Sequence, residues 1–484
     1  MSLVHAPSTL CVRNQRACVS ASCQYRVSSR PSRFRTRSVP RQAFVWRGGM
    51  NDQASVELLL RRQHVMPPWI PLYHPAAPLE IVSGNGRYLY DRAGREYLDF
   101  YSGVAANSLG YDVPEVRDRV LERIRTGVVH TSTFYLDRSR IELAERIARL
   151  SGIPDPVVFF TCSGSEAVET ALLLATEYRR SRQVIALRHS YHGRSFGALS
   201  TTGDNRWLGL GAAPLNVTHV RAGQPEEGVG SELDHASYLR LCSEELEELV
   251  DEVLPQPVAA MLAEPVQGIA GAVPLEPRQL ATYAEILGER DIPLIVDEIQ
   301  TGWGRTGRFW GYEWDEVCPD MLVFAKGVAN GFALGGVVGR REIMSCLPMP
   351  SVSTFGGNPL AVSAGDATLE VIERRNLTDR AYRAGELLWK RLQRGTGFSC
   401  VDRLRGRGLL LGLTCVLPGT TVPSAEFAAT VQDECRDHGL LVGLGGSRGN
   451  CLRIMPPLTV SDDELRQGAD VLVDALDRVR ASWG

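Results

Sequence analysis

"VAAMLAEP" (258–265), "EPRQLATYAEILGER" (276–290) and "PLIVDEI" (293–299) follow one another in the middle of the chain. The first and third segments are apolar runs of strand length, and the second places apolar residues at helical spacing. Strands that are apolar on both faces and alternate with helices are typical of a parallel sheet covered on both sides. These three segments therefore predict an α/β protein.

The same alternation continues on both sides of this stretch. We expect further strands in "PVVFFT", "QVIALRH", "MLVFAK" and "ALGGVVG", and a helix in "GSEAVETALLLATEYRR" (164–180). A different pattern follows residue 358, where two helices lead into the strand-like runs "GLLLGLTCV", "LLVGL" and "CLRIMP". The fold class that we predict is α/β: a large, mostly parallel sheet of about seven strands with helices on both faces, plus a smaller α+β domain built from both chain ends.

Bulk composition excludes several classes of protein. The chain has 484 residues, 44% of them hydrophobic, and a formal net charge of −3. A balance this close to neutral argues against nucleic acid as a partner. No apolar run approaches the roughly 18 residues of a membrane helix, so we expect no membrane association. The eleven cysteines show no paired spacing, which favours reduced thiols and no metal site.

Residues 1–49 differ from the rest because they contain nine arginines, many serines and no acidic residue. One interpretation is a mitochondrial transit peptide, which has this composition. A second is a mis-called start, with translation beginning at Met50. A third is a disordered tail. We expect a cytoplasmic protein, or a mitochondrial-matrix protein if the segment is a transit peptide, and we exclude the segment from the fold.

Lysine is rare in this chain. Only Lys326 and Lys390 occur among 53 basic residues, so arginine supplies nearly every other positive charge. Lys390 lies in a helical pattern beside two arginines, which indicates an exposed helix face. Lys326 ends the apolar run "MLVFAK". A desolvated lysine can act as a nucleophile, which arginine cannot, so Lys326 is a candidate catalytic residue rather than a chance surface lysine.

Four predicted strands end in motifs that carry reactive or ligand-binding residues. Ligands of open parallel sheets bind at the carboxyl ends of the strands. The four motifs there are "TCSGSEA", "RHSYHGRS", "DEIQTG" and "AKGVANG". In the first, Gly164 and Ser165 open a helix and would bind a phosphate with their backbone N–H groups, although Ser163 and Glu166 also fit an ordinary capping box.

Asp297 ends the strongly apolar segment "PLIVDEI". A buried carboxylate needs a cation or hydrogen-bond donors, so a salt bridge to an arginine is one interpretation. The other is that Asp297 keeps a ring nitrogen protonated. A lysine that forms an imine, a phosphate site and a carboxylate for a pyridinium nitrogen together indicate pyridoxal 5′-phosphate.

From about residue 80 onward the chain resembles the class III aminotransferases, which have the fold of aspartate aminotransferase. The resemblance rests on "LIVDEIQTGWGRTGRFWGYEWDEVCPDMLVFAKGVANG" and "STFGGNPLAVSAGDATLEVI". The segments "YLDFYSG" and "HTSTFY" resemble the alanine–glyoxylate aminotransferase branch. The implied domains are an N-terminal part of the small domain at 50–100, a large cofactor-binding domain at 101–357 and a C-terminal small domain at 358–484.

The resemblance also implies a role for each site residue. Lys326 forms a Schiff base with the cofactor, Asp297 pairs with the pyridine nitrogen, and Gln300 reaches the ring oxygen. The expected phosphate and ring contacts come from Gly164, Ser165, Tyr191, His192 and, from the neighbouring subunit, Thr354. The resemblance thus implies a homodimer with shared active sites.

One departure from the family bears on the substrate. Many ω-amino acid aminotransferases have "EPVQGE", whose glutamate pairs with an arginine near the C-terminus. Here the segment reads "EPVQGI", so Ile269 stands where that glutamate would be, and the matching arginine is Arg453. We expect Arg453, with Tyr101 nearby, to bind the α-carboxylate of a substrate.

The resulting prediction is ping-pong transfer of an amino group from a small α-amino acid such as alanine to a 2-oxo acid or aldehyde of the glyoxylate or pyruvate type. The alternatives are an ω-amino acid or 4-aminobutyrate-type aminotransferase, or an aminomutase or decarboxylase of the same fold. A nucleotide-dependent dehydrogenase would need a suitably placed GxGxxG, which we do not find.

Overall fold

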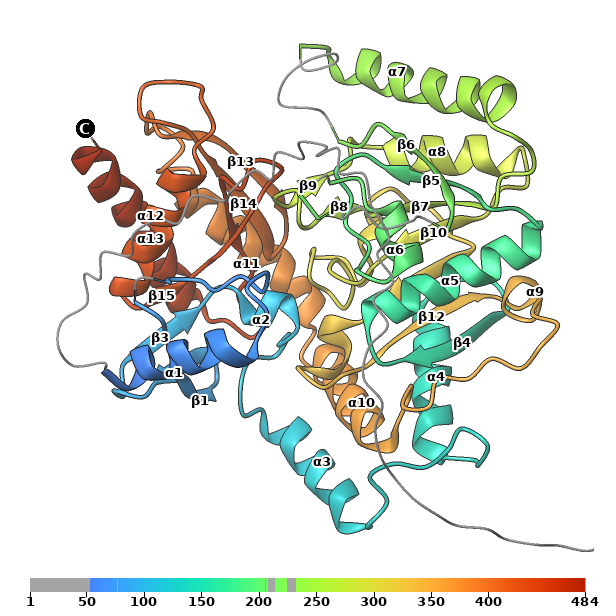
Figure 1. Ribbon diagram of the computed structural model, residues 1–484, viewed down its shortest axis with the longest axis horizontal. Helices are drawn as coiled ribbons and strands as arrows, with labels where there is room; N and C mark the ends of the chain where they lie inside the picture. Colours follow the sequence, from blue (N-terminus) through green and yellow to red (C-terminus); the bar gives the residue numbers. More distant parts are fainter. Residues whose placement is uncertain (1–52, 76, 205, 208–213, 224–231, 484) are drawn as a thin grey trace, which may run out of the picture.

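The computed structural model describes residues 53–75, 77–204, 206–207, 214–223 and 232–483 (Figure 1). The interpretations of residues 1–49 therefore lie outside the described residues.

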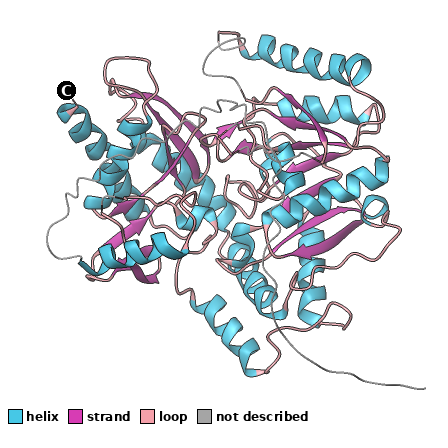
Figure 2. Cartoon of the chain, in the orientation of Figure 1, coloured by secondary structure: helices cyan, strands magenta, loops and turns pink. Residues whose placement is uncertain are grey.

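A seven-stranded sheet forms the centre of the larger part of the molecule (Figure 2). In spatial order its strands are β4 (Pro156–Thr161), β12 (Gly335–Arg340), β11 (Met321–Phe324), β10 (Leu294–Asp297), β7 (Ala260–Ala263), β5 (Gln183–Leu187) and β6 (Asn216–Val220). Only β12 runs antiparallel to its neighbours, so the other six strands point the same way. The predicted α/β class with a mostly parallel sheet is confirmed.

Both faces of this sheet are buried, because neighbouring residues of one strand belong to different hydrophobic clusters. In β10, Ile295 packs into the cluster on the α5 side, whereas Leu294 and Val296 pack into the opposite cluster. Side chains alternate between the two faces of a strand, so a strand covered on both sides must be apolar throughout. This explains the unbroken apolar run in "PLIVDEI".

Helices of the larger part cover the sheet and line its edges (Figure 1). They are α4 (Arg138–Leu150), α5 (Gly164–Arg179), α6 (Phe196–Thr201), α7 (His235–Glu248), α8 (Gln279–Gly288), α9 (Arg341–Met344) and α10 (Pro359–Arg374). A further helix, α3 (Pro114–Arg125), lies away from the sheet and packs against α10. Side chains cap several of them: Asn358 accepts a hydrogen bond from the backbone of Ala361 at the start of α10, and Pro359 occupies the first position of that helix.

The smaller part contains two four-stranded sheets. One joins β1 (Ile81–Asn85), β2 (Tyr88–Asp91) and β3 (Glu96–Asp99) to β15 (Leu440–Leu441); the other contains β13 (Val401–Arg407), β14 (Leu410–Cys415), β17 (Cys451–Ile454) and β16 (Gly443–Gly445). Because β3 pairs in parallel with β15, both ends of the described chain contribute to one unit, as predicted. Figure 1 shows the blue N-terminal and red C-terminal elements side by side.

Helices pack around these two sheets, and short elements connect the parts. The helices are α1 (Gln53–Val65), α11 (Leu377–Leu392), α12 (Ala425–Asp437) and α13 (Asp462–Ser482), and the short elements are α2 (Ser102–Ala105), β8 (Val266–Gln267) and β9 (Val273–Pro274). Lys390 is exposed on α11, which confirms its assignment to a solvated helix face. In the described ranges, no helix combines the length and apolar character needed to cross a membrane.

Candidate active site

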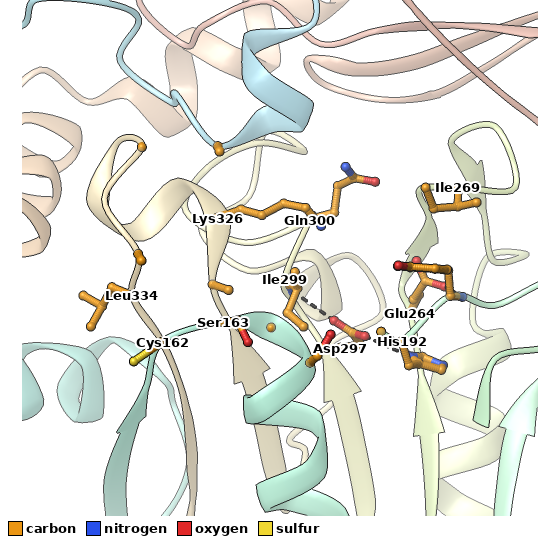
Figure 3. A pocket seen from close by; sticks show the side chains of 18 of the residues that line it. Cys162, Ser163, His192, Glu264, Ile269, Asp297, Ile299, Gln300, Lys326 and Leu334 are labelled. Atoms are coloured by element: carbon orange, nitrogen blue, oxygen red, sulfur yellow. Dashed lines mark hydrogen bonds and ion pairs between the residues drawn. The ribbon is translucent and has the colours of Figure 1, made fainter. Parts of the chain in front are cut away.

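A cavity of about 310 Å³ opens at the carboxyl edge of the seven-stranded sheet. Figure 3 shows strand arrowheads ending below its labelled side chains. Seven of the ten predicted site residues line it: Gly164, Ser165, Tyr191, His192, Asp297, Gln300 and Lys326. They belong to the four motifs that follow predicted strands. The rule that ligands bind at the carboxyl ends of parallel strands therefore predicted a common site for these residues.

Lys326 follows β11 directly and begins a short 3-10 helix (Lys326–Ala329). Its backbone has a φ of 45°, a left-handed conformation that is uncommon for a residue with a side chain and costs about 1–3 kcal/mol. The surrounding fold therefore holds this lysine in a strained position. In the described part of the chain, the Lys326 amine makes no ion pair or hydrogen bond, which leaves it available to a ligand.

Burial lowers the pKa of the Lys326 amine to about 8, because the charged form loses its hydration. The positive charge of Arg453 lowers this pKa further, whereas the carboxylates of Asp297 and Glu264 raise it. At pH 7 about a tenth of the amine is therefore uncharged, far more than for an ordinary lysine, and the uncharged form is the nucleophile.

Asp297 ends β10 and is almost wholly buried. Its Oδ2 lies 2.7 Å from Nδ1 of His192, and its Oδ1 accepts a hydrogen bond from the backbone N–H of Ile299 at 3.1 Å (Figure 3). Among the described residues, the side-chain partner of the carboxylate is thus a histidine and not the arginine of the alternative interpretation.

The N-terminus of α5 faces the same cavity through Cys162, Ser163, Gly164 and Ser165. Ser163 caps the helix by accepting a hydrogen bond from the backbone of Glu166. The reciprocal bond of a capping box is absent, because the Glu166 carboxylate accepts from the backbone of Cys162 instead. The first N–H groups of a helix have no intrahelical partner and attract anions, so this end of α5 can hold a phosphate.

Glu264 is a buried site residue that the sequence interpretation missed. Its two carboxylate oxygens accept hydrogen bonds from the backbones of Tyr191 at 2.9 Å and Gly268 at 3.0 Å. Burial raises the pKa of Glu264 to about 7. Glu264 follows β7, so the same strand-end rule that selected the other four motifs could have found it.

Arg453, on β17, is only 1% exposed and has no carboxylate partner among the described residues. Its Nη2 donates to the amide oxygen of Gln300 at 2.9 Å, and its Nη1 lies 3.4 Å from the Tyr101 hydroxyl. Arg453 does not border the cavity itself; Gln300 does. A Cβ atom at Gly445 would lie 2.4 Å from Cδ of Arg453, so the glycine in neighbouring β16 makes room for this side chain.

Ile269 lines the cavity, so the position at which the motif "EPVQGE" would place a glutamate belongs to the site (Figure 3). Its side chain is apolar and cannot pair with Arg453.

Thr354 is exposed and does not border the cavity of its own chain. The adjacent Ser353 donates a hydrogen bond to Glu166, so the loop that carries Thr354 lies beside the start of α5. The contact predicted for Thr354 involves a second subunit and stays a prediction.

These residues fit pyridoxal phosphate by their chemistry. The cavity combines an unpartnered lysine, a buried carboxylate and a helix N-terminus, and its volume lies in the range of small-molecule sites, about 300–1,000 Å³. Within the described ranges, no group of three or more His, Cys, Asp or Glu side chains is arranged to hold a metal ion.

Similarity to known proteins agrees with this chemistry. The pattern of the family described as aminotransferase class-III matches residues 72–476. The chain is 34% identical to alanine–glyoxylate aminotransferase 2 homolog 2, mitochondrial, of Arabidopsis thaliana, over 96% of this chain and 95% of the relative. It is 35% identical to an acetylornithine aminotransferase of Bifidobacterium longum, over 82% of this chain and 91% of the relative.

Solved structures share the fold. An amine transaminase from an uncultivated Pseudomonas species, in its PLP-bound form, superposes with a TM-score of 0.78 at 28% identity, over 86% of this chain and 98% of that chain. The family pattern and the relatives extend over most of the chain, including every element that lines the cavity. The chain belongs to the class III aminotransferases and is a pyridoxal-phosphate-dependent transaminase.

Proposed function

We propose that this enzyme moves an amino group from a small α-amino acid, such as alanine, to a 2-oxo acid or aldehyde of the glyoxylate or pyruvate type by a ping-pong mechanism. The proposal depends on the environment of Arg453. Its guanidinium is buried and has no carboxylate partner among the described residues, and the nearby cavity is lined by the apolar Ile269. Leaving a buried charge without an opposite charge is costly, so the site favours a ligand that brings a carboxylate.

Bound pyridoxal phosphate supplies an aldehyde that carries the amino group and a ring that withdraws electrons from the substrate. Lys326 is the residue that holds the cofactor covalently through its Nζ. When it is free of the cofactor, the same Nζ would move a proton to and from the substrate's α-carbon as general base and acid. In the cofactor-free protein, burial lowers the pKa of this amine to about 8.

Asp297 holds a proton on the ring nitrogen of the cofactor in this proposal. His192 orients the carboxylate through the 2.7 Å contact to Oδ2. The backbone hydrogen bond from Ile299 fixes the other oxygen, so the carboxylate cannot rotate freely.

Gly164 and Ser165 would hold the phosphate, and Tyr191 would pack against the ring. Glu264 positions Tyr191 by accepting its backbone N–H. Gln300 would contact the ring oxygen, and Thr354 of a neighbouring subunit would complete the phosphate site. The enzyme is then a homodimer with shared active sites.

An exposed apolar surface supports the dimer. Leu136 is 93% exposed, Phe134 80% and Phe355 59%, although each is large and hydrophobic. Phe134 borders a second cavity together with Ser351, Val352 and Ser353, immediately before Thr354. A second copy that covers this surface would bring Thr354 to the partner's phosphate site.

Two compartments fit the chain: the cytoplasm, or the mitochondrial matrix if residues 1–49 act as a transit peptide. The Arabidopsis relative is named as mitochondrial, which supports the second. Cell fractionation with N-terminal sequencing of the mature protein distinguishes the two.

The function is tested by a panel of donors and acceptors. Alanine, 4-aminobutyrate and 1-phenylethylamine are each offered with glyoxylate or pyruvate, and the new amino acid and new oxo compound are both quantified. Alanine should give the highest kcat/KM. Formation of oxo and amino products in equal amounts distinguishes transamination from mutase or decarboxylase chemistry.

A second candidate is an aminotransferase for ω-amino compounds. The 35% identity to an acetylornithine aminotransferase favours it. Higher kcat/KM with 4-aminobutyrate or acetylornithine than with alanine would replace the first proposal by this one.

A further inference from the structure

The guanidinium of Arg453 already has a partner at the edge of the cavity, and that partner is neutral. The amide oxygen of Gln300 accepts a hydrogen bond from Nη2 at 2.9 Å, across 153 positions of sequence. Nε of Arg453 is buried and donates to no described atom. An arginine has five N–H donors, so this guanidinium has unused capacity toward a second acceptor.

Gln300 connects Arg453 to the cavity, because it both borders the cavity and bonds the guanidinium. Gln300 lines the cavity and Arg453 does not. A carboxylate that entered the cavity would therefore meet the amide of Gln300 before it reached the guanidinium.

The position of the Gln300 amide depends on its neighbours. A Cβ atom on residue 268 would lie 1.6 Å from Oε1 of Gln300, so only glycine at that position admits the amide where it lies. On its other side, Nε2 of Gln300 lies 3.5 Å from the backbone oxygen of Val104, the outer limit of a hydrogen bond. The Arg453 contact is thus the shortest polar contact that Gln300 makes among the described residues.

The strengths of the competing interactions favour exchange. A carboxylate brings a full negative charge and can accept two parallel hydrogen bonds from a guanidinium, whereas the amide oxygen brings no charge and accepts one. A substrate carboxylate can therefore displace Gln300 from Nη2. A glutamate in its place could not be displaced as readily.

We infer that Gln300 is the resting partner of Arg453 and a specificity-determining residue: its amide occupies the guanidinium in the absence of substrate and yields it to an entering α-carboxylate. Amines that lack a carboxylate leave the Gln300–Arg453 contact intact. The inference rests on the proposed function, because it assumes that Arg453 receives the carboxylate.

The experiment measures binding of propionate, a carboxylate without an amino group, to the holoenzyme by isothermal titration. Gln300→Glu should weaken propionate binding at least tenfold, because the new carboxylate pairs with Arg453. Gln300→Ala should strengthen it about threefold or more, because no resting partner must be displaced. Far-UV circular dichroism and the thermal unfolding midpoint show that each variant is folded, and neither readout depends on the cofactor contact assigned to Gln300.

A double-mutant cycle identifies Arg453 as the residue through which Gln300 acts. In the Arg453→Ala background, Gln300→Glu and Gln300→Ala should each change propionate affinity less than twofold. Equal effects in both backgrounds, or unchanged affinity in both single variants, would overturn the inference. If Gln300→Glu does not fold, the Gln300→Ala result decides alone.

Kinetics give a second readout. The ratio of kcat/KM for alanine to that for 1-phenylethylamine should fall at least tenfold in Gln300→Glu. The fall should come from a higher KM for alanine. A wild-type enzyme that transfers an amino group from no α-amino acid would contradict the proposed function. A wild type that uses alanine but shows an unchanged ratio in Gln300→Glu contradicts only the inference.

Discussion

Nδ1 of His192 lies 2.7 Å from Oδ2 of Asp297, and both side chains are buried. His192→Ala leaves the carboxylate with the Ile299 N–H as its remaining bond. We expect the free energy of unfolding of the cofactor-free protein to fall by about 3 kcal/mol, the lower end of the cost of an unpaired buried charge. Asp297→Asn keeps a neutral partner for His192 and should cost less than half as much. Urea denaturation measures both, and equal losses would mean that packing, not charge, makes the contact important.

Lys326→Ala should abolish transamination almost completely while the protein still binds pyridoxal phosphate, because the other cofactor contacts remain. Lys390→Ala is the matched control, since it removes the only other lysine from an exposed helix face and should keep full activity. Borohydride reduction of the holoenzyme, followed by peptide mapping, should find the pyridoxyl group on Lys326. A label on Lys390 would contradict the assignment.

The pH dependence of stability should report the depressed pKa of Lys326. The folded-state pKa is about 8, below the ordinary 10.5, so the unfolded chain binds more protons between these values. This group therefore destabilises the cofactor-free protein at pH 7, and the effect fades as pH rises from 8 toward 10.5. Lys326→Met should be more stable than wild type at pH 7, with a smaller difference at pH 9.5. A difference in the urea midpoint that stays constant across this range would show that the lysine pKa is not depressed.

Arg453→Ala should lower kcat/KM for alanine by roughly 2–4 kcal/mol in transition-state terms, the cost of truncating one member of a buried charge pair. Amines without a carboxylate should lose much less. Ile269→Glu should raise the KM for alanine, because it gives Arg453 an internal carboxylate partner. The check is the ratio of kcat/KM for alanine to that for 1-phenylethylamine, which would stay constant if Arg453 did not touch substrate.

Leu136→Arg should weaken the dimer and lower cofactor retention, because a charge replaces an apolar side chain that is 93% exposed in the single chain. Val422→Arg is the matched control: Val422 is 54% exposed but lies in the smaller part, away from the surface that borders Thr354. Analytical ultracentrifugation measures the dissociation constants. A dimer equally weakened by both changes would place the interface elsewhere.

Local patterns predicted most of the fold because each buried strand is apolar on both faces. They missed β1, which is exposed over most of its length, and β13, whose sequence "VDRLRGR" carries three arginines. They also missed β6, the edge strand of the seven-stranded sheet, which is fully buried only at Val220. Such strands are stabilised by pairing with β2, β14 and β5, and pairing across a sheet leaves no mark in the strand's own periodicity.

Some features of the candidate site could likewise be predicted from the sequence, and others could not. Residues at strand ends could be collected from the sequence because parallel strands end at one edge. The contact of Gln300 with Arg453 could not be predicted from the sequence. Gln300 lies in the loop after β10 of the larger sheet, whereas Arg453 lies on β17 of a different sheet. Thr354 lies outside the cavity of its own chain, so a single chain gives no geometric support for its role.

The pairing of β3 with β15 has a consequence for biosynthesis. Leu98 of β3 pairs with Leu440 of β15, so the ribosome must add 342 residues after Leu98 before the pairing residue of β15 has been synthesised. At about 5–20 residues per second this delay is roughly 20–70 s. During that time β3 has an unpaired edge, and Arg453 has not yet been synthesised. The larger sheet can form on the ribosome, but the carboxylate-binding side of the active site is completed only after almost the whole chain has emerged, so the nascent chain needs protection from aggregation at this edge.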